Sequence, residues 1–314
     1  MERVLCVGSV TTDVIVTPVD TLPPPGVLQA VRGTTTHVGG CASNAAIDLA
    51  KLGAPASLSC RVGQDSFGDF VAATVSQAGV DASGIVRDPK VSTTSSVVLV
   101  HSDGERSFLY NPGSTSSFSA QDVRDEDLQA CGILFVAGAM LLSSFDGEPC
   151  AGLLRKAQQM GKFTVMDTAW DFEDRWMEKI APSLPYLDLF MPSYEEAARL
   201  SGEKAPARIA DVFFQMGAKS VIIKLGKDGA YFCEPGGDRY TLPTYRAIKP
   251  VDTTGAGDSF CAGFLCGLAQ GWDYRRSGAF ANAVGTHCIM EVGASTGIKP
   301  MAEILDFMAR TPLE

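Results

Sequence analysis

Several features that would assign this chain to a particular class of protein are missing from its sequence. No run of about 18 to 20 apolar residues occurs, so no membrane-spanning helix is expected. Lys and Arg number 26 against 36 Asp and Glu, giving a formal net charge of −10. Because nucleic-acid binding depends on neutralising phosphates, this balance argues against a nucleic-acid partner. Polar residues interrupt the N-terminal MERVLCVGSV early, which favours a first β-strand over a secretory signal.

Residues that build metal sites or disulfide frameworks are also few or badly spaced. The three histidines form no HExxH unit, and the nine cysteines include no CxxC pair. An odd number of cysteines without metal-ligand spacing favours reduced thiols in a cytoplasmic protein. The first strand is followed by GSVTTD, which supplies only Gly8 of a GxGxxG pattern. A nicotinamide-dependent oxidoreductase is therefore disfavoured.

What the sequence does contain is an alternation of short apolar runs with segments of helical periodicity. This alternation is typical of a mostly parallel sheet covered by helices on both faces, and runs such as VIIKL fit strands buried on both sides. Expected strands are residues 4–8, 57–62, 133–137, 163–167, 187–191 and 221–225; expected helices are 43–52, 67–77, 147–160, 207–216, 256–270 and 275–290. The prediction is one three-layer α/β/α domain formed by residues 1–314.

Two stretches depart from this alternation, because neither has a helix between its strand-like runs. They are residues 12–38 and residues 92–112, the second with a hairpin signal at Asp103-Gly104. Together they are expected to form a small antiparallel sheet that projects from the domain. Such a sheet can serve as a lid over a site and can pair with a second subunit, so a homodimer through the lid is expected. A surface hairpin without a role is the alternative.

The most informative segment is DTTGAGDSFCAGFLCGL, residues 252–268. Its periodicity predicts a helix that begins near Ala256 or Gly257, directly after a glycine-rich turn. The backbone N–H groups of Gly255, Ala256 and Gly257 would then form an anion hole suited to phosphate. Asp258 in the first turn could simply favour the helix dipole. A base beside a phosphate site is the second interpretation, in which Asp258 accepts the proton of an attacking hydroxyl.

The segment DTTGAGDSF resembles the second signature of the pfkB (ribokinase-like) family of carbohydrate kinases, and HVGGCASNAAIDLAKLG, residues 37–53, resembles the first. The resemblance extends over essentially the whole chain. It implies a ribokinase-like fold with a β-sheet lid. It also implies Mg²⁺-dependent transfer of the γ-phosphoryl group of ATP to a hydroxyl, expected to be a primary alcohol, of a sugar or sugar-like molecule. Asp258 would be the catalytic base.

The resemblance also implies roles for residues elsewhere in the chain. Acceptor hydroxyls would be bound by Asp13, Gly39, Gly40 and Asn44, with Thr11 and Cys41 nearby. The nucleotide would lie along Lys224, Gly226 and Gly229, with Asn282 near the adenine and Ser193 near the phosphates. Glu196 would act on Mg²⁺ through water, and Asp252 and Thr254 match positions that in many relatives help hold an activating monovalent cation, expected to be K⁺.

The sequence departs from the family pattern at several of these positions. Ser193 replaces the Asn of the family's Asn-x-x-Glu element, although Glu196 is kept. Compared with ribokinase, Thr11 replaces an Asn, Cys41 replaces a Lys, and the stretch 138–142 lacks a carboxylate. These changes argue against plain ribose and leave room for a modified or base-bearing acceptor. A nucleoside kinase of the same family is the alternative, and a non-catalytic family member acting as a binding protein is a third hypothesis.

Overall fold

The computed structural model describes residues 1–245 and 248–311 of the chain. A nine-stranded sheet forms its centre, in the order β13-β12-β11-β10-β9-β8-β1-β4-β5. The neighbours from β11 to β5 are paired in parallel, whereas β12 pairs antiparallel with both β11 and β13. These strands are β1 (Val4–Gly8), β4 (Ala56–Gly63), β5 (Asp81–Asp88), β8 (Ile133–Ala139), β9 (Phe163–Thr168), β10 (Leu189–Phe190), β11 (Val221–Lys224), β12 (Ala230–Cys233) and β13 (Arg239–Leu242).

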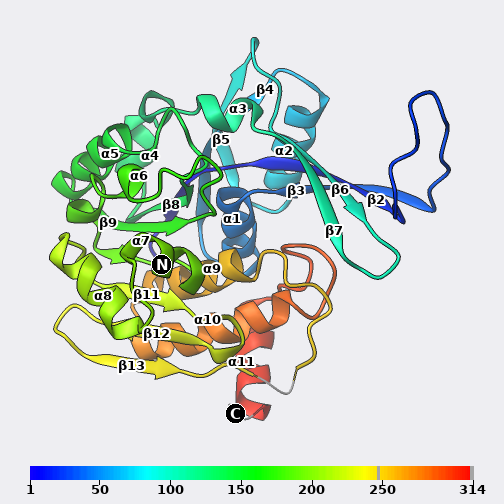
Figure 1. The fold of residues 1–314 in the computed structure, drawn as a ribbon. Coiled ribbons are helices and arrows are strands. Elements are labelled where there is room, and N and C mark those ends of the chain that lie inside the picture. The colour runs from blue at the N-terminus through cyan, green and yellow to red at the C-terminus, as the bar shows by residue number, and fades with distance from the viewer. Residues whose placement is uncertain (246–247, 312–314) are drawn as a thin grey trace.

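Helices cover both faces of this sheet, as Figure 1 shows. They are α1 (Cys41–Lys51), α2 (Ser66–Gln77), α3 (Gly113–Ser117), α4 (Asp125–Ala130), α5 (Glu148–Gln159), α6 (Met177–Ile180), α7 (Tyr194–Ser201), α8 (Pro206–Gln215), α9 (Ala256–Ala269), α10 (Tyr274–Cys288) and α11 (Met301–Arg310). Along β1, Val4 and Cys6 pack into the core on the α1 and α9 side, whereas Leu5 and Val7 pack into the core on the α5 and α8 side. Because central strands such as β1 and β8 are buried on both faces, with helices on each side, the predicted three-layer α/β/α class is confirmed.

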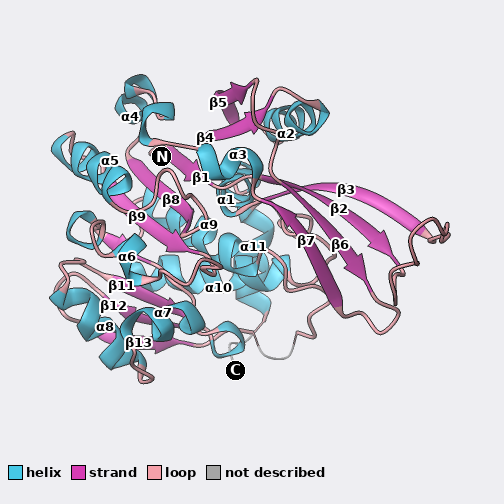
Figure 2. Ribbon diagram, turned by 45° about the horizontal axis from the view of Figure 1, so that its top comes forward, coloured by secondary structure: helices cyan, strands magenta, loops and turns pink. Residues whose placement is uncertain are grey.

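A second sheet projects from this body (Figure 2). Its strands are β3 (Gly33–Gly39), β2 (Thr11–Thr17), β6 (Ser95–Val100) and β7 (Arg106–Asn111), in that order, and they are called the small sheet below. The expectation of an antiparallel sheet is wrong at its centre, where β2 and β6 pair in parallel. Two antiparallel hairpins, β2–β3 and β6–β7, meet side by side there. Each hairpin is local, but the pairing between them depends on how the large sheet orients both.

The order of the large sheet reverses between β1 and β8, since the chain passes from β1 to β4 and β5 before it returns to β8. In open parallel sheets, ligands bind outside the carboxyl ends of the strands at such a reversal. The small sheet leaves the body from the same edge, because β2 starts three residues after β1 ends. None of the helices in the described part of the chain combines the length and apolar composition that a bilayer crossing requires.

Candidate active site

Two helices begin at this edge, and each begins at a glycine with a positive φ. Gly40 precedes α1 with φ 97°, and a Cβ there would lie 2.5 Å from Val10 Cα. Gly255 precedes α9 with φ 79°, and a Cβ there would lie 2.5 Å from the carbonyl oxygen of Ala294. Only glycine tolerates both the conformation and the close approach. The first turns of α1 and α9 are thereby placed against each other.

The predicted base and one predicted acceptor-binding residue meet between these helices. Asn44 Nδ2 donates a hydrogen bond to Asp258 Oδ2 at 2.8 Å. The other amide atom, Asn44 Oδ1, is buried and has no hydrogen-bond partner among the described residues. Burial raises the pKa of Asp258, while the bond from Asn44 and the positive charge of Lys224 oppose that rise. The hydrogen bond from Asn44 orients the Asp258 carboxylate, whose oxygens can take up a proton. The unpaired Asn44 Oδ1 can accept a hydrogen bond from a hydroxyl group of a ligand.

The predicted anion hole lies at the start of α9. The N–H of Ala256 contacts the carbonyl oxygen of Thr253 at 3.3 Å, whereas the N–H groups of Gly255 and Gly257 donate to no described residue. Lys224 Nζ lies 3.4 Å from where a Cβ on Gly257 would be, so a positive charge stands directly beside this turn. Free backbone donors, the positive end of a helix and an ammonium group together favour a bound phosphate.

Lys224 is held in this position by a buried carboxylate that the sequence analysis did not include in the site. Lys224 Nζ lies 2.6 Å from Asp167 Oδ1, and Cys261 Sγ lies 3.4 Å from Asp167 Oδ2. Both charged side chains are largely buried, with 11% and 2% of their surface exposed. Burial acts to lower the pKa of Lys224, but the negative charge of Asp167 overcomes this and raises it. The ammonium therefore stays charged beside the anion hole.

Glu196 and Ser193 lie next to this pair, in the first turn of α7. Ser193 caps the helix: its Oγ accepts from the N–H of Glu196 at 3.4 Å, and Glu196 Oε2 accepts from the N–H of Ser193 at 3.1 Å. Thr168 Oγ1, at the end of β9, donates to the same Glu196 oxygen at 2.8 Å. Burial and the charge of Asp167 raise the pKa of Glu196. Two carboxylates crowded beside one ammonium fit a divalent cation, whose charge would relieve their repulsion.

The remaining acceptor-binding candidates line the start of the small sheet. A Cβ on Gly39 would lie 2.3 Å from Asp13 Oδ2, so the glycine lets this carboxylate lie against the backbone of β3. Thr11 Oγ1 donates to Asp13 Oδ1 at 3.4 Å. Burial raises the pKa of Asp13, and the bond from Thr11 opposes that rise. Cys41 begins α1 and is close enough to Asp258 that the charge of the carboxylate, added to burial, raises the pKa of the thiol.

Asp252 and Thr254, predicted for a monovalent cation, are in contact with an arginine of the small sheet. Arg106 Nη2 lies 3.1 Å from Asp252 Oδ1, and Arg106 Nη1 donates to Thr254 Oγ1 at 2.7 Å. Burial acts to raise the pKa of Asp252, but hydrogen bonds from Thr254, Arg106 and the N–H of Gly293 lower it to about 2. A guanidinium on these oxygens already supplies positive charge, so the side chains do not fit a second cation in this arrangement.

The predicted nucleotide-binding residues follow the same edge toward β13. Gly226 and Gly229 form the turn between β11 and β12, directly after Lys224. Asn282 Nδ2 donates to the carbonyl oxygens of Pro243 at 2.9 Å and Leu242 at 3.4 Å. The Asn282 amide thus ties α10 to the end of β13, and its role near an adenine stays a prediction.

Two charged residues of this site were missed by sequence reasoning. Asp167 ends the expected strand 163–167, and a polar residue at the carboxyl end of a buried parallel strand is the signal that could have identified it. Arg106 lies in the hairpin 92–112, and nothing in its neighbourhood indicates a partner 146 or 148 positions away, at Asp252 or Thr254. Only the packing of the small sheet brings it to the site.

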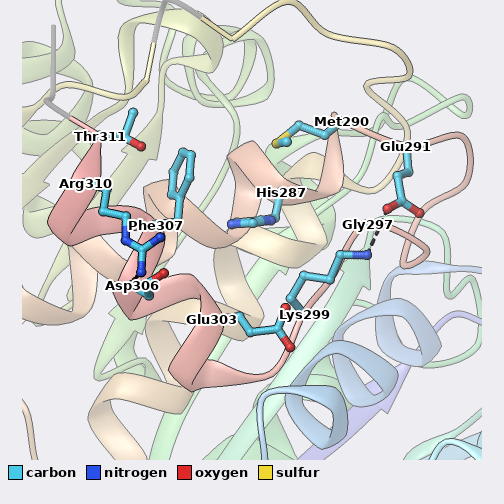
Figure 3. A pocket seen from close by; sticks show the side chains of 10 residues that line it. All are labelled: His287, Met290, Glu291, Gly297, Lys299, Glu303, Asp306, Phe307, Arg310 and Thr311. Atoms are coloured by element: carbon cyan, nitrogen blue, oxygen red, sulfur yellow. Dashed lines mark hydrogen bonds and ion pairs between the residues drawn. The ribbon is translucent and has the colours of Figure 1, made fainter.

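A surface cavity of about 400 Å³ lies elsewhere, between the end of α10 and α11 (Figure 3). His287 and Phe307 form part of its wall, and an ion pair of 2.9 Å between Lys299 and Glu291 spans one rim. None of the predicted site residues lines it. This cavity therefore lies apart from the predicted residues that converge at Asp258.

Comparison with known proteins identifies the family and the fold. The model of the pfkB family carbohydrate kinases matches residues 1–301. The 2-dehydro-3-deoxygluconokinase of Bacillus subtilis (strain 168) is 28% identical over 293 residues, covering 90% of each chain. The aminoimidazole riboside kinase of Salmonella typhimurium is 28% identical over 272 residues, covering 83% of this chain and 84% of its own. Arabidopsis thaliana ribokinase complexed with ribose and ATP has the same fold, with a TM-score of 0.86 at 24% identity over 98% of each chain. The chain belongs to the pfkB family of carbohydrate kinases and is an ATP-binding phosphotransferase of that family.

Proposed function

We propose that the protein transfers the γ-phosphoryl group of ATP to a primary hydroxyl of a sugar-like acceptor, with Asp258 as the catalytic base. The observation that carries this proposal is the convergence of Asn44, Asp258 and the α9 anion hole at one helix junction. A base, an acceptor-binding amide and a phosphate-binding turn within one junction are the parts that in-line phosphoryl transfer requires.

In the proposed step, the acceptor oxygen attacks the γ-phosphorus while its proton passes to Asp258. The new O–P bond forms as the bond to the β,γ-bridging oxygen breaks, and ADP leaves with that electron pair. Gly255 and Gly257 donate backbone hydrogen bonds to the transferring group, and Lys224 adds positive charge beside it. Because charge on the phosphoryl oxygens is shared by these donors in the transition state, the arrangement favours transfer.

Magnesium enters this proposal through Glu196, with Asp167 as the second nearby carboxylate. The ion would neutralise phosphate oxygens of the nucleotide when bound. Ser193 caps α7 and thereby orients Glu196, so the replacement of the family Asn keeps the carboxylate in place. For K⁺, Arg106 already contacts Asp252 Oδ1 and Thr254 Oγ1, and no step is assigned to that ion.

The small sheet is proposed to act as a lid and as the interface of a homodimer. By the strand register, Asp13, Ser96 and Tyr110 share one face, which in this proposal covers the acceptor. Val14, Val97 and Leu109 lie on the opposite face, where Leu109 is 57% exposed. A second copy covering this apolar face would remove it from water. Leu109→Asp should shift the protein from dimer to monomer in sedimentation velocity, and an unchanged sedimentation coefficient would contradict this interface.

The proposal is tested by coupled ADP production with Mg·ATP and a panel of pentoses, hexoses, sugar acids and nucleosides. Acceptor-dependent ADP formation that is abolished in Asp258→Asn is the expected result. A protein that binds ATP yet phosphorylates no member of the panel would instead favour the hypothesis of a non-catalytic binding protein.

A cytoplasmic location is proposed as well, because all nine cysteines, each within the described residues, are free thiols.

A further inference from the structure

Three aromatic side chains near the acceptor-binding residues are exposed although their backbones are well anchored. Tyr110 lies on β7 of the small sheet, and Trp170 and Phe172 lie in the loop that follows β9; these three are called the aromatic cluster. Their exposed fractions are 42%, 58% and 54%. Large apolar surfaces that stay in water within a shaped site mark a place where another molecule binds.

The cluster connects the small sheet with the main body. The rings of Tyr110 and Phe172 lie 6.1 Å apart in an edge-to-face arrangement. Trp170 rests on the buried Trp176 in a similar geometry, with ring centroids 4.8 Å apart. Part of each outer ring stays in contact with water, and Lys179 Nζ lies over the Phe172 ring, 5.9 Å from its centroid. An exposed ring surface can receive a planar group from a ligand.

The loop that carries Trp170 and Phe172 is held by Asp171, which lies between them and is 2% exposed. Asp171 accepts from the backbone N–H groups of Arg175 and Trp176, both at 2.6 Å. Lys179 Nζ donates to the same carboxylate at 2.9 Å and to the carbonyl oxygen of Met140 at 2.8 Å. These bonds hold the backbone of the loop on both sides of Asp171, and both flanking rings are exposed in this arrangement.

The aromatic cluster lies close to residues that are proposed to bind the acceptor. Tyr110 lies on the same face of the small sheet as Asp13, two strands away, which corresponds to about 10 Å. Partial burial, with Cys41 and Asp13 nearby, raises the pKa of Tyr110 to about 12, so the phenol stays neutral. Trp170 follows Thr168, whose hydroxyl bonds Glu196, by two residues. The cluster thus joins the loop after β9 to the face of the small sheet that carries Asp13.

The proposed acceptor site has few polar side chains that could bind hydroxyl groups. Thr11 and Cys41 are less polar than the Asn and Lys of ribokinase, and Met140 supplies no carboxylate at the end of β8. Met140 is wholly buried, and its backbone is held with a positive φ of 82° by Asp146 and Lys179. Hydroxyl-binding groups are few beyond Asp13 and Asn44, while apolar ring surface is abundant.

We infer that the acceptor is a nucleoside, whose ribose hydroxyls lie against Asp13 and Asn44 and whose heteroaromatic base packs on Tyr110, Trp170 and Phe172. This inference rests on the proposed function and gives the acceptor class for that same site. A base contributes a flat apolar surface that matches the exposed ring surfaces, and a free pentose or hexose has no such surface. The primary hydroxyl of the ribose is the group that faces Asp258.

The inference is tested with the full chain and Mg·ATP by comparing kcat/KM for uridine, cytidine, inosine and adenosine with kcat/KM for D-ribose and D-fructose. At least one nucleoside should exceed both sugars. Phe172→Ala and Trp170→Ala should each lower kcat/KM for that nucleoside by about tenfold, the effect of one lost ring contact, and leave kcat/KM for D-ribose unchanged. Phe172→Tyr, which keeps the ring, should retain the nucleoside activity.

Leu28→Ala is the matched control, since Leu28 is 96% exposed and lies away from the cluster in the β2–β3 loop. Turnover of base-free sugars that equals or exceeds that of every nucleoside would overturn the inference while leaving the kinase proposal intact. Equal losses for ribose and nucleoside in Phe172→Ala would also overturn it. Calorimetry with the same nucleosides separates the two proposals. Nucleoside binding that Phe172→Ala weakens, without ADP formation, would support the acceptor class and contradict the kinase, whereas the absence of both binding and turnover would contradict both.

Discussion

Asn44 and Asp258 are 214 positions apart in the sequence, yet their side chains share a hydrogen bond of 2.8 Å between the first turns of α1 and α9. This bond fixes one carboxylate oxygen of Asp258 and leaves Asn44 Oδ1 without a partner among the described residues. An unpartnered buried acceptor is costly unless a ligand satisfies it. The pair therefore links the proposed binding position of the acceptor hydroxyl to the proposed base.

Asp258→Asn should keep the fold and ATP affinity but reduce kcat by roughly 10²–10⁴-fold, the range for loss of a general base. Since burial raises the pKa of Asp258, the activity of the native enzyme should fall on the acid side at a higher pH than an exposed aspartate would cause. Stopped-flow or steady-state kinetics from pH 4 to pH 9 measure both effects. Near-native turnover in the variant would rule out Asp258 as the base.

Asn44→Ala should raise KM for the acceptor more than KM for ATP, and should lower kcat because Asp258 loses its orienting bond. One hydrogen bond to a charged group is worth about 1.5–3 kcal/mol, so a combined loss of roughly ten- to a hundredfold in kcat/KM is expected. Ser295→Ala, in the 292–299 loop outside the acceptor site, serves as a control for general destabilisation. Equal effects on the two KM values would argue against a role in acceptor binding.

Arg106→Ala should loosen the contact between the small sheet and the α9 loop, because it removes both the ion pair with Asp252 and the bond to Thr254. Hydrogen exchange should then rise in residues 106–111 and 252–257 without a change elsewhere. Arg106→Lys preserves the charge but cannot contact Asp252 and Thr254 through two nitrogens at once, and should recover only part of the protection from exchange.

The activity of the native enzyme should change little on adding K⁺, whereas the activity of Arg106→Ala should increase.

A native enzyme that K⁺ strongly activates would show that Arg106 leaves Asp252 during catalysis, contrary to this expectation.

The contact between Arg106 and Asp252 can also be tested through the pH dependence of stability, since the pKa of Asp252, about 2, lies below the ordinary value for aspartate. Its folded-state pKa is depressed, so its contribution to stability is present above about pH 4 and is lost as the pH falls toward 2. Asp252→Asn should remove that part of the acid-induced loss of stability.

Lys224→Met should destabilise the protein by about 3–5 kcal/mol, because Asp167 would be left as an unpaired buried carboxylate. Combining it with Asp167→Asn should restore much of the stability, although activity should stay low without the ammonium beside the anion hole. Urea unfolding at pH 7 measures the first effect, and ADP production measures the second. If the double variant regained native turnover, Lys224 would have no part in phosphate binding.

Asp48, one helical turn after Asn44 in α1, allows the effect of a buried carboxyl group on stability to be tested. It accepts from Ser259 Oγ at 2.6 Å, and burial raises its pKa to about 7. A carboxyl whose folded-state pKa is raised binds more protons when folded, so its effect lowers stability as the pH rises from about 4 to 7. Asp48→Asn should therefore be more stable than the native protein at pH 8, by roughly 2–4 kcal/mol, and show little gain near pH 4.

Urea unfolding at several pH values measures this difference, with the exposed Asp103→Asn as the matched control. A constant stability difference between Asp48→Asn and the native protein from pH 4 to pH 8 would contradict the raised pKa.

The sequence alone determined the features that depend on local pattern. A short apolar run and a period-3.6 pattern each lie within one segment, so β1 and the start of α9 at Ala256 matched their predictions. The glycine-rich turn before Asp258 is equally local, and the family resemblance added the pairing of its two signatures. These features needed no knowledge of how distant segments pack.

Tertiary structure decided the contacts between segments that are distant in the chain. The parallel pairing of β2 with β6 could not be read from two hairpins, since register between them is set by the body that holds both. The same holds for Lys224 with Asp167, for Arg106 with Asp252, and for the aromatic cluster. Such contacts leave no periodic trace in the sequence, because each depends on side chains that meet only when separate elements pack at the carboxyl edge of the sheet.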